Sequence, residues 1–355
     1  MKVKFKLRET KTSPDIRKMP LVVILGPTAS GKSALGVALA KKFNGEVVSA
    51  DSRQIYRGLD VGTGKITPKE MQGIPHHLLN IADPRKQCTV AEYAKEARRA
   101  IAGIYKRGRI PFIVGGTGFY IDAVARGAIY PKVPPNRALR KILGKLAPAT
   151  LLHRLQKLDP ERSKTIDQKN PRRLIRALEI IKATKKSIAP IIIGAPYNTI
   201  FIAIRRDPQE LRRRIQRAVV RHIDRGLLKE TKHLIRSGIS RKRLADLGIG
   251  YRSAVERVDG KISRAQLIGK YVAGDWRYAK RQMTWLRRYP DIHPVTTGNS
   301  VNSRRGKRWD QKSPVETTVF GPNSNGVHWI RNKTEAAGLI KNFVNRDQKA
   351  VPRKR

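Results

Sequence analysis

The sequence predicts an α/β fold, a parallel β-sheet with flanking helices plus an inserted helical domain. Short apolar runs at 21–25 (LVVIL), 45–51 (GEVVSAD) and 109–116 (RIPFIVGG) end at polar or glycine-rich tips, as buried parallel strands do. Helical segments separate these runs, which is typical of alternating βα units. A proline-rich connection at residue 130, followed by apolar residues at helical spacing, marks the start of the insertion.

The remaining elements follow from the same patterns. We expect helices over 32–43, 91–108, 208–226 and 273–289, and an apolar strand that returns to the sheet before 205. A polar, basic stretch without periodicity follows the core and predicts disorder. The predicted division is a basic N-terminal extension (1–20), an α/β core (21–129 and 197–290), a helical insertion (130–196), a disordered basic linker (291–326), a terminal strand and helix (327–345) and a basic tail (346–355).

The last core helix has a predicted packed face and a predicted charged face. Its apolar residues recur with the 3.6-residue period of a helix, which predicts a buried stripe. The stripe consists of Val272, Trp276, Ala279, Met283 and Leu286, and it leaves Arg277, Arg281 and Arg288 pointing outward.

The charge of the chain indicates a polyanionic partner. Lys and Arg number 76 against 27 Asp and Glu, a net charge of +49, which favours nucleic-acid binding. The one cysteine, Cys88, excludes an internal disulfide framework and a zinc site built on several cysteines. No apolar run resembles a signal sequence or is long enough to span a membrane, so we expect a cytoplasmic protein.

A phosphate-binding loop follows the first strand. Residues 26–33 read G-x-x-x-x-G-K-S between a strand and a helix, the context that a P-loop requires, so the sheet is predicted to be P-loop NTPase-like. Backbone N–H groups of such a loop converge on phosphate oxygens, Lys32 adds a positive charge, and the Ser33 hydroxyl can bind Mg²⁺. The phosphates of a nucleotide such as ATP, of a nucleic acid or of a diphosphate leaving group all fit. The predicted loop residues are Gly26, Pro27, Thr28, Ala29, Ser30, Gly31, Lys32 and Ser33.

A carboxylate stands at the end of the second strand. Asp51 is followed by the polar run SRQIY, which suits contact with a second substrate. An acid beside a P-loop can bind a metal ion, cap a helix or act as a general base, and the spacing alone leaves the three roles open.

Several strings resemble a known family, the tRNA dimethylallyltransferases. They occur in family order over residues 21–289, with weaker agreement over 327–344. They are GPTASGKS, SADSRQIYRGLDVGTGK, HHLLNIADP, AEY, GRIPFIVGGTGFYI, NPRRLIRALEI, GIGYR and AKRQMTWLRR. The resemblance implies transfer of a dimethylallyl group from dimethylallyl diphosphate to the exocyclic amine of the adenosine 3′ of the anticodon, with Mg²⁺ as cofactor.

The resemblance also implies roles for individual residues. Asp51 is the expected general base, and Lys32 and Thr117 complete the expected catalytic set. The expected partner is the tRNA anticodon stem-loop, bound by a monomer. The segments that match tRNA-contacting parts of the family supply Asp51, Ser52, Arg53, Gln54, Thr117, Arg140, Arg172, Arg173, Arg176, Gly250, Tyr251 and Arg252.

One departure concerns the diphosphate. The family reads R-I-x-x-R where this chain has Arg214 and Ile215, and the second arginine of that pattern falls on Ala218. Arg217 stands one position early, a rotation of about 100° around a helix. We expect Arg217, or a neighbour such as Arg213, to contact the diphosphate instead.

The adjacent histidines do not predict a metal site. His76 and His77 have no cysteine nearby, so we interpret them as structural.

Three other functions are compatible with the sequence. They are an isopentenyltransferase acting on free adenine nucleotides, a tRNA-binding P-loop protein with impaired catalysis, and a kinase or ATPase.

Overall fold

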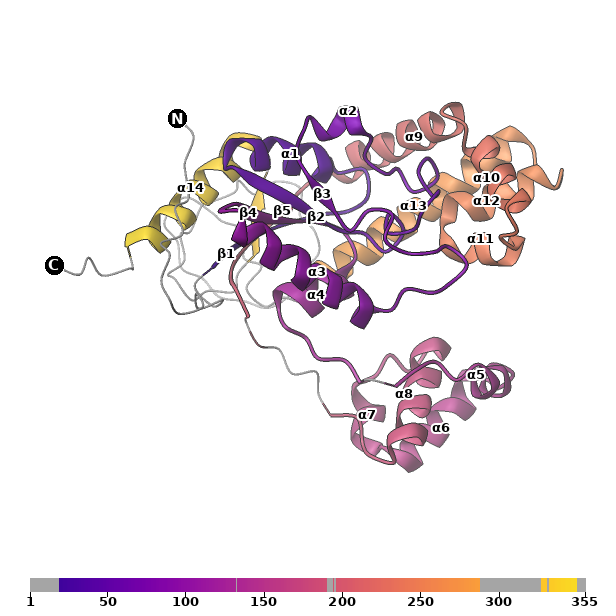
Figure 1. The fold of residues 1–355 in the computed structure, drawn as a ribbon. Helices are drawn as coiled ribbons and strands as arrows, with labels where there is room; N and C mark the ends of the chain where they lie inside the picture. The colour runs from indigo at the N-terminus through magenta and orange to yellow at the C-terminus, as the bar shows by residue number, and fades with distance from the viewer. Residues whose placement is uncertain are drawn as a thin grey trace. The chain divides into compact units, whose positions relative to one another are not determined.

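The computed structural model describes residues 19–131, 133–189, 194, 196–287, 327–330 and 332–349. The chain forms two compact units, the smaller of which comprises residues 127–194 (Figure 1). The predicted linker lies outside the described residues, as do all but two residues of the predicted N-terminal extension and the tail beyond residue 349.

The larger unit is built on a six-stranded parallel sheet of order β3-β2-β4-β1-β5-β6. In register, Val22 of the central strand lies opposite Phe112 on one side and Ile200 on the other, and all three are buried. The predicted α/β fold is therefore confirmed. The strands are β1 (Pro20–Leu25), β2 (Gly45–Ala50), β3 (His76–His77), β4 (Ile110–Gly115), β5 (Asn198–Ile204) and β6 (Val327–Ile330).

Helices cover this sheet and extend beyond it. The buried faces of α1 and α14 join one core cluster with the strands, through residues such as Leu39 and Ile340. Among the described residues, no helix combines the length and the apolarity needed to cross a membrane. The helices of this unit are α1 (Lys32–Lys42), α2 (Pro68–Met71), α3 (Val90–Lys106), α4 (Gly118–Ala125), α9 (Pro208–Asp224), α10 (Leu227–Arg236), α11 (Arg241–Leu247), α12 (Ile249–Val258), α13 (Arg264–Leu286) and α14 (Lys333–Lys349).

The buried face of α13 differs from the predicted stripe. Ala279 and Leu286 are buried as expected, whereas Val272, Trp276 and Met283 are only partly covered. Small and polar side chains take their place because α13 packs against loop backbone as well as apolar side chains. The buried positions include Tyr271, Gly274 and Gln282. Arg277 and Arg281 are exposed as predicted, and Arg288 lies outside the described residues.

The smaller unit is a helical domain with its own core. Leu143, Leu151, Leu155 and Leu174 belong to one buried cluster, which a helical pattern of apolar residues produces when four helices pack together. The helices are α5 (Arg137–Leu143), α6 (Pro148–Leu158), α7 (Pro160–Thr165) and α8 (Pro171–Thr184).

Candidate active site

Four polar segments meet at the carboxyl edge of the sheet. The P-loop follows β1, Asp51 follows β2, Thr117 follows β4 and Arg206 follows β5. Since β2, β4, β1 and β5 are neighbours, these segments lie side by side at the edge where parallel sheets bind ligands.

The P-loop has the backbone that its glycines permit. Gly26 has φ of 146° and Gly31 has φ of 98°, a region that side-chain-bearing residues rarely adopt. A Cβ on Gly26 would also lie 2.9 Å from Ser30 Oγ. These two positions therefore require glycine if the loop is to wrap around an anion.

Lys32 and Ser30 supply side-chain donors in the loop. Lys32 Nζ donates a hydrogen bond to the Pro27 carbonyl at 2.7 Å, and burial lowers the pKa of Lys32 to about 8, although the charge of Asp51 offsets part of this shift. Ser30 Oγ is buried and has no hydrogen-bond partner in the structure. A bound phosphate would supply acceptors for such donors.

Asp51 organises the loop after β2. Its Oδ1 accepts hydrogen bonds from the backbone N–H groups of Arg53 at 2.8 Å and Gln54 at 3.4 Å. Gln54 Nε2 in turn donates to the Gly64 carbonyl at 3.2 Å. Among the described residues, no hydrogen bond engages Asp51 Oδ2, so one carboxylate oxygen is available to accept a proton from a substrate.

Thr117 joins the ends of two strands. Its Oγ1 accepts a hydrogen bond from the Ser52 N–H at 3.0 Å, and its side chain also hydrogen-bonds with Tyr278 of α13. Burial and the charge of Asp51 raise the pKa of Tyr278 to about 12. Thr117 therefore holds the Asp51 loop in place from β4.

Sequence reasoning did not single out Gln282, which lies on α13 within the AKRQMTWLRR string. Its Oε1 accepts a hydrogen bond from the Thr28 N–H of the P-loop at 2.8 Å, and its Nε2 donates to the Gly116 carbonyl at 3.0 Å. A Cβ on Gly116 would lie 2.1 Å from Gln282 Nε2, so this contact needs a glycine. The sequence feature that could have identified it is an uncharged polar residue that follows two basic residues within this string.

Asp275, one turn before Ala279 on the same helix, was also missed. Burial raises the pKa of Asp275 to about 7, and the nearby charge of Asp51 adds to the shift. A second carboxyl group thus lies near Asp51. The sequence feature that could have identified it is a single acidic residue in a basic helix.

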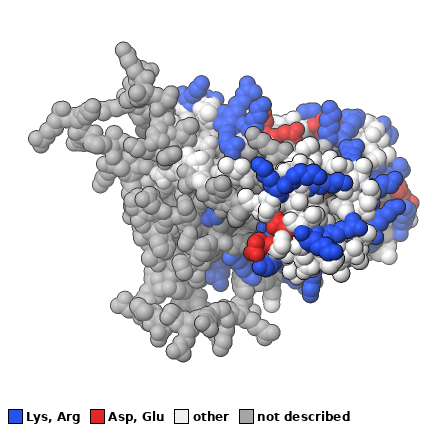
Figure 2. Space-filling view, turned by 90° about the horizontal axis from the view of Figure 1, so that it is seen from below, with Lys and Arg blue, Asp and Glu red and all other residues white. Residues whose placement is uncertain are grey.

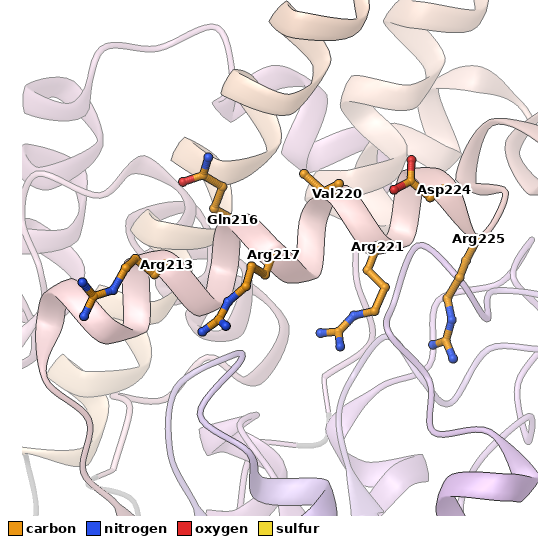
Figure 3. Close-up of a pocket in the computed structure, with 7 residues that line it drawn as sticks. All are labelled: Arg213, Gln216, Arg217, Val220, Arg221, Asp224 and Arg225. Carbon is orange, nitrogen blue, oxygen red and sulfur yellow. The ribbon is translucent and has the colours of Figure 1, made fainter.

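Two arginines are candidates for contact with the diphosphate. Arg206 Nε donates a hydrogen bond to the Ser30 carbonyl at 3.1 Å, so this guanidinium lies against the P-loop. Arg217 is exposed on α9 beside Arg213, where it lines a groove (Figure 3). Among the described residues it makes no hydrogen bond or ion pair. The sequence analysis did not identify Arg206, although basic residues at the end of a strand could have indicated an anion contact there.

The predicted tRNA-binding arginines of the smaller unit fall into two pairs. Arg140 binds both carboxylate oxygens of Glu179, at 2.9 and 2.7 Å, and Arg176 binds the same carboxylate. Burial alone would raise the pKa of Glu179, but the hydrogen bonds from both arginines lower it to about 2. Arg172 and Arg173 are exposed, and neither forms an ion pair with a described residue.

The predicted tRNA-binding segment on α12 is mostly buried. Tyr251 is fully buried, and its hydroxyl donates to Glu230, whose carboxylate accepts hydrogen bonds from the N–H groups of residues 60–62. A Cβ on Gly250 would lie 2.6 Å from the Tyr271 ring. The Tyr251 side chain therefore supports the loop after Asp51, and in this segment only Arg252 is exposed for direct contact with RNA.

The histidine pair has the structural role expected for it. His77 Nε2 lies 2.7 Å from Glu46 Oε2, a carboxylate that Arg107 and Arg109 also bind. His76 Nδ1 lies 2.8 Å from the Ile74 carbonyl. The part of the chain that the structure describes contains no cluster of three His, Cys, Asp or Glu residues suited to a metal.

Comparison with known proteins shows the family. The sequence profile described as IPP transferase matches residues 54–289, more than half of the chain. The chain belongs to the IPP transferase family. This IPP transferase is 39% identical over 287 residues to the tRNA dimethylallyltransferase of Pelotomaculum thermopropionicum, covering 79% of this chain and 91% of the relative. It is 42% identical over 283 residues to that of a Thermoanaerobacter species, covering 77% and 90%.

Solved structures agree with these relatives. The full-length tRNA isopentenylpyrophosphate transferase of Bacillus halodurans superimposes with a TM-score of 0.63 at 33% identity, covering 94% of this chain and 99% of its own. A eukaryotic dimethylallyltransferase acting on tRNA superimposes with a TM-score of 0.64 at 29% identity, covering 76% and 70%.

Proposed function

We propose that this IPP transferase transfers the dimethylallyl group of dimethylallyl diphosphate to the exocyclic amine of the adenosine 3′ of a tRNA anticodon. The observation that carries the proposal is the placement of a P-loop, with the buried Ser30 hydroxyl unpartnered and the Lys32 ammonium close by, beside the half-engaged carboxylate of Asp51. The relatives named tRNA dimethylallyltransferase support the choice of substrates.

The P-loop side holds the donor. The diphosphate accepts hydrogen bonds from the loop N–H groups and from Lys32, and Arg206 adds a second positive charge at the loop. Oxygen ligands of the kind that Mg²⁺ prefers are present: Ser33 is exposed at the start of α1, and the Asp51 carboxylate is close enough to the neighbouring Lys32 to act on its charge. When bound, Mg²⁺ would neutralise charge on the departing diphosphate.

Asp51 acts on the acceptor. The carbon–oxygen bond to the diphosphate breaks, the carbon–nitrogen bond to adenosine forms, and Asp51 accepts the proton that the amine loses. A positioned base of this kind contributes about 10²- to 10⁴-fold to the rate. Thr117 holds the loop, and Ser52, Arg53 and Gln54 are the proposed contacts to the RNA around the target nucleotide.

Basic side chains hold the tRNA. Arg172, Arg173 and Arg252 are exposed and are the proposed direct contacts, whereas Arg140 and Arg176 contribute through Glu179 and their remaining N–H groups. Lys and Arg dominate the charged surface in Figure 2, and few acids interrupt them. A stacked adenosine must leave the anticodon loop to reach Asp51, at a cost of a few kcal/mol. We expect this reaction on tRNA to take place in the cytoplasm.

One experiment tests the function and its alternatives. Purified protein is incubated with unmodified tRNA, Mg²⁺ and dimethylallyl diphosphate, and the digested nucleosides are weighed by mass spectrometry. Prenylated adenosine in tRNA supports the proposal. Parallel incubations test the alternatives. Turnover of AMP in the absence of tRNA would indicate the free-nucleotide enzyme, and consumption of added ATP would indicate a kinase or ATPase. Binding of tRNA without product would indicate an impaired enzyme.

A further inference from the structure

A row of arginines runs along α9 outside the site described above. Arg213, Arg217 and Arg221 recur every four residues, so they project from one side of the helix, as Figure 3 shows. They line an open groove of about 820 Å³. All three side chains are exposed, and among the described residues none of them forms a hydrogen bond or an ion pair.

Charges elsewhere in the groove are already compensated. Arg225 continues the row but lies 4.0 Å from Glu70 of α2. Asp224, which also lines the groove, binds Arg264 at 2.8 Å. Among the described residues, Arg213 and Arg217 therefore have no acidic partner, and Arg221 shares the charge of Glu70 with Arg225. The row keeps an excess of positive charge, which favours an anionic ligand.

The length of the row indicates what that ligand is. At 1.5 Å per residue, Arg213 and Arg221 stand about 12 Å apart along the helix axis. Arg206, which contacts the P-loop, precedes α9, so the row leads away from the diphosphate end of the site. A single diphosphate cannot neutralise charges spread over this distance, whereas a nucleic-acid strand carries one phosphate per nucleotide.

Another side of α9 packs near the loop that follows Asp51. Glu70, on α2, pairs with Arg225, and His222 Nε2 of α9 would lie 3.0 Å from a Cβ on Gly64. Gln54, three residues after Asp51, donates to the Gly64 carbonyl. All of these residues belong to the larger unit, so α9 and the Asp51 loop are parts of one compact body.

We propose that the α9 groove, formed by Arg213, Arg217 and Arg221, binds the sugar-phosphate backbone of the RNA substrate. The identity of that RNA as tRNA rests on the proposed function, but the groove binds phosphates regardless of the chemistry at Asp51. The contacts are to phosphate, so they contribute affinity and salt dependence rather than base specificity.

The test is RNA binding by the full chain at several salt concentrations. The triple variant Arg213→Ala, Arg217→Ala and Arg221→Ala keeps good helix formers on α9. We expect it to bind unmodified tRNA at least tenfold more weakly at physiological salt, with the slope of log K against log salt reduced by about 2. Its KM for dimethylallyl diphosphate should stay within twofold of wild type.

A matched control removes the same charge elsewhere. Arg212→Ala, Lys229→Ala and Arg236→Ala changes three exposed basic residues of the same unit that do not line the groove. Equal loss of RNA binding in both triple variants, or a raised donor KM with unchanged RNA binding, would overturn the proposal. Since binding is measured without turnover, a wild-type protein that binds tRNA through the groove but forms no product would contradict the proposed function alone.

Discussion

Gln282 of α13 links the P-loop to the end of β4, because its side-chain amide accepts a hydrogen bond from the Thr28 N–H and donates one to the Gly116 carbonyl. Replacing it with leucine leaves two backbone groups without partners in a buried place, at a cost of about 1–3 kcal/mol. We expect Gln282→Leu to lower kcat/KM for dimethylallyl diphosphate about tenfold or more, mainly through KM, in steady-state prenylation assays. Gln282→Glu keeps the acceptor for Thr28 and should recover part of the loss. The exposed neighbour Thr284 provides the control, since Thr284→Ala should behave as wild type.

Asp51 can be tested without changing its shape. Asp51→Asn keeps an oxygen that accepts the Arg53 N–H but cannot take a proton from the amine. We expect prenylated nucleoside to form about 10²- to 10⁴-fold more slowly, with tRNA affinity within a fewfold of wild type. Single-turnover rates near those of wild type would show that Asp51 is not the base.

Replacing Arg206 or Arg217 separates binding of the donor from binding of tRNA. Arg206→Ala should raise the KM for dimethylallyl diphosphate about tenfold, because its guanidinium lies on the P-loop. If Arg217 replaces the family arginine, as the sequence predicts, Arg217→Ala should slow prenyl transfer through the donor. If it belongs to the α9 groove, the same variant should change only the KM for tRNA. Measuring both KM values for each variant separates the two assignments.

Lys32 should make donor binding depend on pH. A diphosphate binds the protonated amine, and burial lowers the pKa of Lys32 to about 8. The favourable interaction is therefore complete below pH 8 and is lost as pH rises through this value. Titration calorimetry with diphosphate should show affinity falling by up to tenfold per pH unit above pH 8. Lys32→Met should bind weakly at every pH, and an unchanged wild-type affinity at pH 9.5 would contradict the prediction.

Glu179 should stabilise the smaller unit in a pH-dependent way. Hydrogen bonds from Arg140 and Arg176 lower its pKa to about 2, from an ordinary value of 4.5. This stabilisation is present above pH 4.5 and is lost as pH falls towards 2. Glu179→Gln should cost about 2 kcal/mol at pH 7, less than the ~3–5 for a fully buried pair because both arginines are more than a third exposed. Hydrogen exchange of α8 measures the change.

Glu161 is the matched control for Glu179. It pairs with Lys164 in the same unit, but both side chains are exposed. Glu161→Gln should leave the exchange rates of α8 unchanged, and an effect as large as that of Glu179→Gln would contradict the assigned role.

The sequence by itself determined the sheet except for β3, the P-loop and the position of Asp51. These features depend on local patterns: apolar runs of strand length, glycines at fixed spacing, and polar residues at strand ends. Apolar residues at helical spacing also predicted the helical insertion, whose core contains Leu174 and Leu178.

Only the tertiary structure decided which polar residues meet. Gln282 and Thr28 are 254 residues apart, and no local pattern records that they hydrogen-bond. The same holds for Arg206, which contacts the P-loop, and for Tyr251, which is buried and donates a hydrogen bond to Glu230 instead of facing RNA. A helical period gives the direction of a side chain around its own axis, but the partner it reaches depends on how distant segments pack.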